Sequence, residues 1–252
     1  MSDEVLRVGV IGARGRMGSQ VCLAVDSADD LDLVATVGEH DWLFSIADAG
    51  AEVVVDFTHP AAVMEHIRFC VDQNIHCVVG TSGVDGAQFE TIRGWLEHKP
   101  ELGVIVVPNF AIGAVLAARF ARLAAPFFES AEIVELHHAN KIDAPSGNAM
   151  ATARGIAAAR ALAGSRPGPD ATTQEVPGAR GAEIEGIRVH SVRLPGLVSH
   201  QEVLLGAGGE LLTIRHDSSD RSSFMPGVLL AIRQVRSRVG LTIGLESLLG
   251  LE

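Results

Sequence analysis

Residues 135–149 read ELHHANKIDAPSGNA and gather side chains that can bind an anion or transfer a proton. Two adjacent histidines, His137 and His138, are followed by Lys141 and by an Asp-Ala-Pro-Ser-Gly turn that precedes a helical pattern. A helix that begins after such a turn presents backbone N–H groups without intrahelical partners, and these attract a carboxylate or a phosphate. Imidazolium groups, and ammonium groups with a lowered pKa, can release a proton near neutral pH. The segment therefore combines groups that can hold an anion with groups that can protonate it.

Lysine is rare in this chain. Lys99 and Lys141 are the only lysines among 20 basic residues. Arginine keeps its proton at ordinary pH, whereas lysine can release one when its pKa is lowered. A lysine beside two histidines therefore fits proton transfer, although chance alone can place one of two lysines there.

Other interpretations of the same segment remain open. Adjacent residues of a strand point to opposite faces, so one of the two histidines can be an ordinary core residue. His137, His138 and Asp143 are metal-ligand types, but successive strand residues do not converge, and the chain has neither an HExxH nor a paired CxxC motif. We therefore expect no metal site, and we expect Asp143 to be a turn or cap residue.

A glycine-rich turn follows the first apolar run of the chain. Gly12, Gly15 and Gly18 form a G-x-x-G-x-x-G pattern between a predicted strand at 6–11 and a helical pattern. Glycines there allow a tight turn and a close approach of backbone to a pyrophosphate. A turn needed only for helix–sheet packing would look the same, and the spacing differs from the usual G-x-G-x-x-G. Its position at the start of repeated strand–helix units favours dinucleotide binding.

The end of the second predicted strand bears on the choice of cofactor. This strand usually ends in an acid that binds the adenosine ribose. Here it ends in Gly38, and Glu39 follows one position later. Arg14 and Arg16 flank the phosphate turn and can accept an additional phosphate. We therefore expect the protein to use NADH or NADPH.

Apolar spacing predicts the elements that hold these groups. Up to Phe110, apolar runs alternate with helical patterns, which is typical of a parallel sheet covered on both faces. The predicted strands are 6–11, 31–38, 53–57, a run within 75–83 and 103–110. Open parallel sheets bind ligands at the carboxyl ends of their strands. Five polar residues lie at these ends: Asp56, Thr58, Thr81, Ser82 and Asn109. Two of them, Thr58 and Ser82, can equally be helix caps.

The pattern changes after Phe110 and predicts a second, α+β region with a mixed or antiparallel sheet. An Ala-Gly-Gly hairpin signal joins its last two strands, and Pro226 suits the first turn of a final helix. His190, His200 and His216 fall on the late strands, and we assign them no role. The predicted elements are a helix at 111–128 that ends near Pro126, a strand at 131–138, a helix at 148–163, a loop at 164–186, strands at 187–194, 200–206 and 210–216, and a helix at 223–240.

Length and composition exclude several classes of protein. The 252 residues, 47% hydrophobic, fit one large or two modest globular domains. The formal net charge of −11 and the lack of a helix-turn-helix pattern argue against nucleic-acid binding. We see no signal peptide and no membrane span, and we expect a cytoplasmic protein. Cys22, Cys70 and Cys77 are odd in number and lie in apolar surroundings, so we expect reduced thiols.

Together these motifs resemble those of the 4-hydroxy-tetrahydrodipicolinate (dihydrodipicolinate) reductase family. The resemblance spans essentially the whole chain, in the order VGVIGARGRMG, VVVDFTHP, VVGTSG, VPNFAIG, ELHHANKIDAPSGNA and VRLPGLVSHQEVLLG. It implies a Rossmann-type α/β N-terminal domain, 1–111 completed by 221–252. It also implies an α+β substrate and oligomerisation domain, 112–220, on a four-stranded mixed sheet, and a homotetramer assembled through these sheets.

The resemblance also implies an activity and its residues. The reaction is NAD(P)H-dependent reduction of the cyclic dicarboxylate 4-hydroxy-tetrahydrodipicolinate to tetrahydrodipicolinate, in the diaminopimelate route to L-lysine. His137 and Lys141 would donate protons, and the substrate would be held by His138, Lys141, Ser146, Gly147 and Asn148. Asn148 and Ser82 both replace the family's usual threonine. The implied cofactor contacts are Gly12, Ala13, Arg14, Gly15, Arg16, Met17, Gly80, Thr81, Ser82, Val107, Pro108, Asn109 and Phe110.

Two other function classes are compatible with the fold. One is an aspartate- or homoserine-type dehydrogenase, against which the His-His-x-x-Lys stretch argues. The other is a nucleotide-sensing regulator. The net charge of −11 argues against a regulator of this kind that binds DNA.

Two expectations concern the protein as a whole. One helix layer covers only one face of the second sheet, so we expect the other face to be buried against another subunit. The cofactor and substrate residues fall in different predicted domains, so we expect domain closure, with hinges near 111–113 and 216–224. The apolar residues of the late strands that motivate the first expectation are Val189, Val192, Leu194, Val203, Leu205, Leu211 and Ile214.

Overall fold

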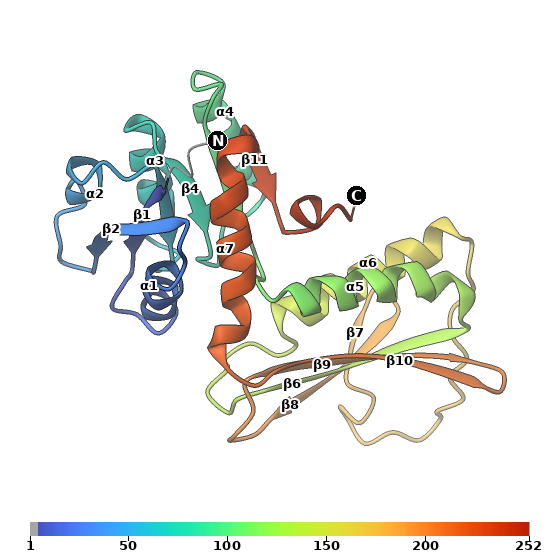
Figure 1. Ribbon diagram of the computed structural model, residues 1–252. Coiled ribbons are helices and arrows are strands. Elements are labelled where there is room, and N and C mark those ends of the chain that lie inside the picture. The colour runs from blue at the N-terminus through green and yellow to red at the C-terminus, as the bar shows by residue number, and fades with distance from the viewer. Residues whose placement is uncertain (1–4, 252) are drawn as a thin grey trace. The chain divides into compact units, whose positions relative to one another are not determined.

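The computed structural model describes residues 5–251, which divide into two compact units (Figure 1). Residues up to Ile112, together with those from Phe224 onward, form the first unit. Gly113–Ser223 form the second unit. The chain therefore passes between the units at two places, after Ile112 and after Ser223.

The first unit is built on a sheet of six parallel strands, which confirms the predicted parallel α/β architecture. The strands β3, β4 and β5 are almost wholly buried and apolar, because helices cover both faces of the sheet. In the order β11-β5-β4-β3-β1-β2, the strands are β11 (Gly240–Ile243), β5 (Gly103–Val106), β4 (His76–Val79), β3 (Val53–Asp56), β1 (Leu6–Ile11) and β2 (Leu31–Val37).

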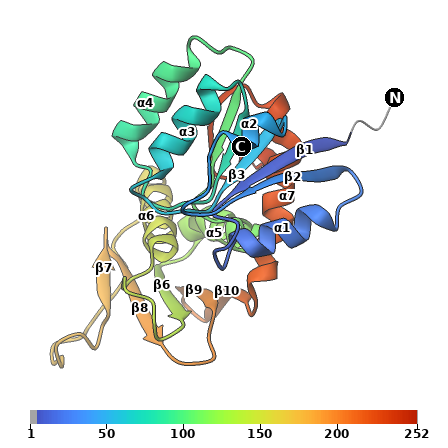
Figure 2. The same ribbon diagram turned by 90° about the vertical axis from the view of Figure 1, so that its left-hand side faces the viewer.

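Two pairs of helices cover this sheet. Figure 2 shows α3 beside α4 on one side of the strands and α1 beside α7 on the other. Asp85 begins α4 with a capping box, since its side chain accepts from Ala87 and Gln88 N–H groups while the Gln88 side chain accepts from Asp85 N–H. The helices of the unit are α1 (Gly18–Asp26), α2 (Ser45–Asp48), α3 (Val63–Asp72), α4 (Gly86–Leu96) and α7 (Met225–Gln234).

The C-terminal segment differs from the prediction of one helix at 223–240. Helix α7 ends at Gln234, a 3₁₀ turn follows at Val235–Ser237, and β11 then adds a sixth strand beside β5. A Cβ at Gly103 would overlap the carbonyl oxygens of Val235 and Arg238, so glycine allows this segment to lie against β5. The apolar spacing of 235–243 fits a helix as well as a strand, which explains the wrong prediction.

The second unit holds a mixed sheet, as predicted, but with five strands instead of four. The additional strand, β7 (Ala182–Ile184), lies in the predicted loop and pairs antiparallel with β8. Glu185 and Gly186 join them with φ values of 51° and 83°, a hairpin turn that the surrounding glycines and prolines hid. In the order β10-β9-β6-β8-β7, the other strands are β10 (Glu210–Ser218), β9 (Ser199–Ala207), β6 (Ser130–His137) and β8 (Ile187–Arg193).

Helices α5 (Ile112–Ala124) and α6 (Gly147–Leu162) cover one face of this sheet (Figure 1). Pro126 lies in a 3₁₀ turn just after α5, close to the predicted end of that helix. Along β6, alternate residues are buried, so Ala131, Ile133, Glu135 and His137 share the face under the helices. We call this the covered face and the opposite one the open face. Small side chains bring the helices close to it, in a core that includes Ala121, Ala125, Ala149, Ala153, Ile156, Val189, Val203 and Leu205.

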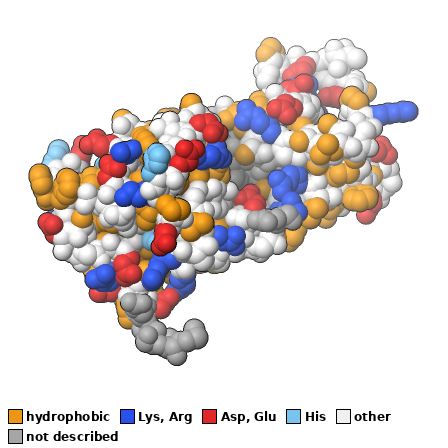
Figure 3. Space-filling view, turned by 90° about the horizontal axis from the view of Figure 1, so that it is seen from above, with side chains coloured by type: hydrophobic (Ala, Val, Ile, Leu, Met, Phe, Trp, Pro, Cys, Tyr) orange, Lys and Arg blue, Asp and Glu red, His pale blue; other side chains and the backbone are white. Residues whose placement is uncertain are grey.

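Some whole-molecule expectations can be compared with the described residues, 5–251. No helix in this range is long and apolar enough to cross a membrane. Within the same residues, no group of three His, Cys, Asp or Glu side chains is arranged to hold a metal ion. Cys70 and Cys77 are buried free thiols, and Cys22 is a half-buried one. Figure 3 shows acidic and basic side chains mixed across one face of the molecule.

Candidate active site

The glycine turn after β1 has the shape that dinucleotide binding requires. Gly12 has a φ of 81°, and a Cβ there would overlap the carbonyl oxygen of Phe57. A Cβ at Gly18 would in turn overlap the carbonyl oxygen of Gly12. Only glycine therefore allows the turn to pack against the chain after β3 and to lead directly into α1. This arrangement places a helix N-terminus at the end of β1, where a pyrophosphate is held in dinucleotide-binding folds.

A pocket of about 610 Å³ lies at the carboxyl ends of β1, β2 and β3. Of the predicted cofactor residues, Gly12, Arg14 and Gly15 line it, whereas Ala13, Arg16 and Met17 belong to the same turn but not to its lining. The full lining is Ile11, Gly12, Arg14, Gly15, Val37, Gly38, Glu39, Asp41, Leu43, Phe57, Thr58, His59, Ala62 and His66. Its size, its glycine turn and its acids at the end of β2 fit a dinucleotide.

Asp41 organises the end of β2, although the sequence patterns did not single it out. Its carboxylate accepts from Gly38 N–H at 2.8 Å and forms an ion pair with Arg14 Nη2 at 2.8 Å. The hydrogen bond from Gly38, helped by the charge of Arg14, lowers the pKa of Asp41. A Cβ at Gly38 would lie 3.0 Å from Arg14 Nη1, so Arg14 lies over this position. Asp41 therefore supplies a second carboxylate, beside Glu39, close to the end of β2.

The loops after β3 and β4 are tied together by Asp56, which is fully buried. It accepts from Thr58 Oγ1 at 2.9 Å and from Thr81 Oγ1, and it lies 2.6 Å from His66 Nδ1. Thr58 N–H also donates to Thr81 Oγ1 at 2.7 Å. Both threonine hydroxyls therefore point inward and brace the loops, and Thr58 is not a helix cap. The hydroxyl hydrogen of Thr81 is therefore already donated to Asp56.

The remaining predicted cofactor residues lie at the ends of β4 and β5, outside the lining of the 610 Å³ pocket. A Cβ at Gly80 would overlap the ring of Phe57, whose centroid is 5.5 Å from that of Phe110. Phe110 is buried, and Asn109 Oδ1 accepts from Ala111 N–H at 2.9 Å. Val107 is also buried, whereas Ser82 and Pro108 are exposed. These residues thus form a rim at the same edge of the sheet, partly packed on aromatic rings.

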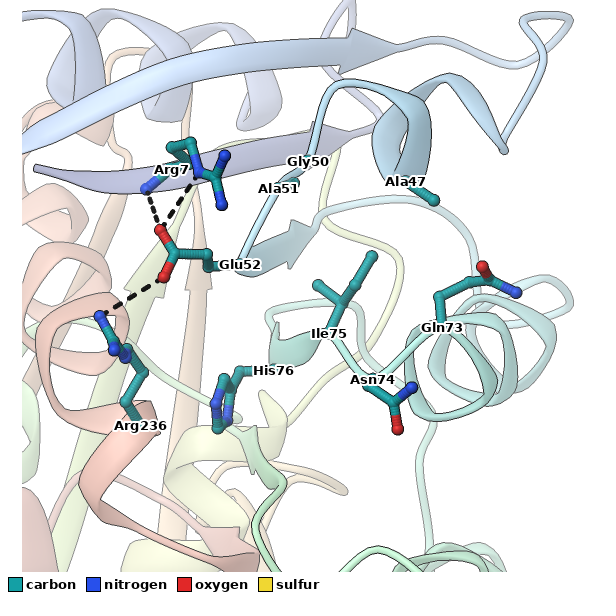
Figure 4. Close-up of a pocket in the computed structure, with 10 residues that line it drawn as sticks. All are labelled: Arg7, Ala47, Gly50, Ala51, Glu52, Gln73, Asn74, Ile75, His76 and Arg236. Atoms are coloured by element: carbon teal, nitrogen blue, oxygen red, sulfur yellow. Dashed lines mark hydrogen bonds and ion pairs between the residues drawn. The ribbon is translucent and has the colours of Figure 1, made fainter.

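A different pocket, of about 430 Å³, lies at the opposite, amino-terminal edge of this sheet (Figure 4). Glu52 accepts there from Arg7 Nε at 3.4 Å and pairs with Arg236 Nη1 at 3.5 Å. His76 Nδ1 accepts from Gly103 N–H at 3.0 Å, which fixes its ring. None of the predicted site residues lines this pocket, and Glu52 already neutralises part of its positive charge.

In the second unit, His137 lies on the covered face of β6 and is 8% exposed. Its Nδ1 is 2.5 Å from Glu135 Oε2, and its Nε2 is 3.1 Å from Ser199 Oγ. Burial alone would raise the pKa of Glu135, but hydrogen bonds from His137, Arg193 and Ser191 outweigh it and hold that pKa at about 2. An ionised carboxylate only accepts, so His137 carries a proton on Nδ1 and directs Nε2 toward Ser199. His137 is therefore buried, but it is not an inert core residue.

His138 and Lys141 belong to the turn that follows β6. Both are half-buried, and Lys141 N–H donates to the His138 carbonyl at 3.1 Å. Lys141 Nζ lies 2.7 Å from Asp143 Oδ1. Burial raises the pKa of Asp143, but hydrogen bonds from Lys141 and nearby backbone groups outweigh it and lower the pKa. Asp143 thus holds the lysine ammonium, a contact that the turn-or-cap interpretation did not include.

Ser146 caps α6, the helix that the sequence predicted after the turn. Its Oγ accepts from Ala149 N–H at 3.2 Å, and its own N–H donates to Glu135 Oε1 at 3.2 Å. Gly147 is exposed, and a Cβ there would meet no atom within 4 Å, so its backbone is accessible. The Asn148 side chain donates to Gln201 Oε1 at 3.1 Å and is thereby directed toward β9. The start of α6 therefore offers backbone N–H groups to an anion.

Three partners of these residues were missed from the sequence: Glu135, Arg193 and Ser199. The spacing of Glu135 and His137 is a usable signal, because residues two apart in a strand point to the same face. Arg193 and Ser199 come from other strands and left no such signal. His190 and His200, to which no role was assigned, pair with Glu132 and Asp217 at 2.7 Å each.

Comparison with known proteins identifies the family. Residues 6–110 match the family model described as "Dihydrodipicolinate reductase, N-terminus", and residues 111–249 match "Dihydrodipicolinate reductase, C-terminus". The chain belongs to the dihydrodipicolinate reductase family. This membership confirms the resemblance found from the motifs.

Individual relatives agree with this assignment. The chain is 59% identical over 246 residues to the 4-hydroxy-tetrahydrodipicolinate reductase of Nocardia farcinica, covering 98% of this chain and 99% of that one. The corresponding enzyme of Mycobacterium marinum is 57% identical over 247 residues, covering 98% and 100%. The solved structure of dipicolinate-bound dihydrodipicolinate reductase from Paenisporosarcina sp. TG-14 is 38% identical, with a TM-score of 0.85 and coverage of 96% and 99%. Scyllo-inositol dehydrogenase from Lactobacillus casei, 11% identical over 96% of this chain and 92% of that one with a TM-score of 0.62, shares the fold alone.

Proposed function

We propose that this protein catalyses the NAD(P)H-dependent reduction of 4-hydroxy-tetrahydrodipicolinate to tetrahydrodipicolinate, in the diaminopimelate route to L-lysine. The observation that carries the proposal is the cluster at 135–148, in which a proton-bearing histidine, a lysine and an accessible helix N-terminus lie along one short segment. The Rossmann-type unit and the family membership support it.

A dicarboxylate suits the start of α6. This helix has 16 residues, and its N-terminus carries the positive end of the helix dipole as well as unpaired N–H groups. We propose that the backbone N–H groups of Gly147 and Asn148 bind one substrate carboxylate, with Lys141 and His138 beside them. Ser146, predicted as a third contact, instead donates its N–H to Glu135 and holds the start of the helix. The relative from Paenisporosarcina sp. TG-14, whose structure contains dipicolinate, supports a substrate of this type.

Proton delivery is assigned to His137 and Lys141. The hydroxylated ring first loses water to give a conjugated imine. Hydride addition to that imine leaves electron density that must be protonated, and an acid close to the substrate accelerates that step. Lys141 has three ammonium hydrogens, one of which Asp143 can accept, so others remain for a substrate. The Nδ1 proton of His137 is held by Glu135, so His137 can donate only from Nε2 and only in its imidazolium form.

The 610 Å³ pocket is the proposed cofactor site. A nicotinamide dinucleotide held there would supply the hydride. We propose that the turn from Gly12 to Met17 holds the phosphates and that the rim at 80–82 and 107–110 contacts the nicotinamide end. Glu39 and Asp41 can accept from ribose hydroxyls, whereas Arg14, which is largely exposed, can turn to an additional phosphate. We therefore expect NADH and NADPH to differ in kcat/KM by less than about a thousandfold.

The open face of the second sheet supports a homotetramer. Strand register places Val134, Leu136, Leu204 and Leu211 on this face, and Leu211 is 67% exposed. Of the residues that motivated the expectation, Val189, Val203 and Leu205 are buried in the core, so they are not available to a partner. We propose that the open face packs against other subunits.

The test is a steady-state assay of NADH and NADPH oxidation with enzymatically generated substrate. We expect oxidation that depends on this substrate and is inhibited by dipicolinate. Aspartate semialdehyde, offered separately, tests the alternative of a homoserine-type dehydrogenase. Cofactor oxidation with the aldehyde but not with the cyclic dicarboxylate would overturn the proposal.

A further inference from the structure

We propose that Glu135 and Arg193 form one buried ion pair that positions both parts of the active site, the imidazole of His137 and the N-terminus of α6. The inference rests on the proposed function, since it assigns roles to residues that support the proposed proton donor and carboxylate site. Neither residue is proposed to touch the substrate.

Each carboxylate oxygen of Glu135 serves one part of the site. Oε2 lies 2.5 Å from His137 Nδ1, and Oε1 accepts from Ser146 N–H at 3.2 Å. Each oxygen also accepts from Arg193, Oε2 from Nη1 at 2.9 Å and Oε1 from Nη2 at 2.8 Å. The Glu135 side chain is completely buried, and these four contacts, together with the hydrogen bond from Ser191, satisfy its acceptors away from solvent. One carboxylate therefore fixes the ring of His137 and the cap of α6 at the same time.

Arg193 extends the same network to the turn between the two parts. Besides Glu135, its Nη1 donates to the Val192 carbonyl at 2.8 Å and its Nη2 donates to the Asp143 carbonyl at 2.7 Å. The four hydrogens of the two terminal nitrogens thus each have an acceptor. Asp143 begins the turn and Ser146 lies near its end, so the ion pair holds both ends of this segment. A lysine cannot reproduce this planar, bidentate geometry.

A comparison within β6 argues that this pair is more than a generic stabilising contact. Glu132, three residues earlier, also bonds to a histidine and an arginine, His190 at 2.7 Å and Arg180. Glu132 lies on the open face, is partly exposed, and contacts no proposed site residue. A buried ion pair is expensive to desolvate and is often replaceable by apolar residues without loss of stability. The Glu135–Arg193 pair carries this desolvation cost at the position where the two oxygens of Glu135 contact His137 and Ser146.

The first test needs no variant. Imidazole ¹⁵N spectra, with the His137 signal assigned by its loss in His137→Asn, report which ring nitrogen carries the proton. We expect the neutral ring of the wild-type protein to be protonated on Nδ1. A neutral His137 protonated on Nε2 would overturn the inference.

The second test compares Glu135→Gln and Arg193→Lys with the matched control Glu132→Gln. We expect the first two to lower kcat and to raise the KM for the dicarboxylate, with kcat/KM reduced by about 10²-fold or more. The Kd for NADH should change less than about threefold, and the control should change kcat/KM less than about threefold. Circular dichroism and light scattering verify that each variant keeps the wild-type fold and mass. Equal losses in the control, or a near-wild-type kcat/KM in both Glu135→Gln and Arg193→Lys, would overturn the inference.

Dipicolinate binding separates this inference from the proposed function. If the wild-type protein does not reduce the cyclic dicarboxylate, the proposed function fails. Calorimetry with dipicolinate still tests the positioning of α6. We expect its Kd to rise at least about tenfold in Glu135→Gln and to stay near the wild-type value in Glu132→Gln. An unchanged Kd in Glu135→Gln would contradict the positioning role whatever the substrate.

Discussion

Acidification should weaken this protein through Glu135 in a defined pH window. In the folded protein the hydrogen bonds of this carboxylate hold its pKa at about 2, below the ordinary value of 4.5. A carboxylate whose pKa is lowered by folding stabilises the folded state above its unfolded pKa and loses this contribution as pH falls toward the folded pKa. The difference corresponds to about 3 kcal/mol, lost between about pH 5 and pH 2. Since Glu135 is fully buried, little of this is removed by solvent screening.

The assay is urea denaturation of the wild-type protein and Glu135→Gln at pH 7, 5, 4 and 3, at one protein concentration. Glutamine does not titrate, so the variant should be less stable at pH 7, and the difference should shrink by about 2 kcal/mol by pH 3, with the remainder lost toward pH 2. Light scattering at each pH checks that the oligomer is unchanged, because dissociation would add its own pH dependence. Parallel stability curves for the two proteins would refute the assignment of a strongly lowered pKa to Glu135.

Further predictions concern catalysis, the cofactor turn and assembly. Lys141→Ala and Lys141→Arg should both lower kcat by about 10²-fold or more, because neither side chain can donate the proton. An Arg variant with near-native kcat would leave His137 as the sole acid. Gly12→Ala should raise the Kd for NADH at least about tenfold without changing dipicolinate binding by calorimetry, since its Cβ would overlap the Phe57 carbonyl. Light scattering should give a tetramer at micromolar concentration, and Leu211→Arg should lower the mass, whereas a monomeric wild type would contradict the proposed packing. Small-angle scattering should change when cofactor and dipicolinate bind together, and identical profiles would count against domain closure.

The sequence predicted the first sheet well because its strands are buried on both faces. Such strands are continuous apolar runs, and they alternate with helices of clear amphipathic spacing. The errors fall where this signal is weak. β7 has only three residues and lies in a segment rich in glycine and proline. The apolar spacing after α7 fits a helix as well as a strand, so only the pairing of β11 with β5 determines that this segment is a strand.

The site was predictable where its residues are close in sequence and hidden where they are not. His137, Lys141 and Ser146 lie within ten positions and share a recognisable pattern. Arg193 is 58 positions from Glu135, and Arg14 is 27 positions from Asp41, so no local spacing reveals these pairs. The inward direction of Thr81 likewise depends on Asp56, a residue of another strand. Local patterns identify candidate groups, whereas the partners that orient them come from the tertiary fold.

The central claim is that this protein transfers hydride from a reduced nicotinamide to a cyclic dicarboxylate. The most direct measurement uses NADH with both hydrogens at C4 of the nicotinamide ring replaced by deuterium, enzymatically generated 4-hydroxy-tetrahydrodipicolinate and mass spectrometry of the product. We predict tetrahydrodipicolinate that carries one deuterium, formed by the wild-type protein and at least about 10²-fold more slowly by Lys141→Ala. Unlabelled product, or oxidation of the cofactor without any reduced dicarboxylate, would contradict the claim.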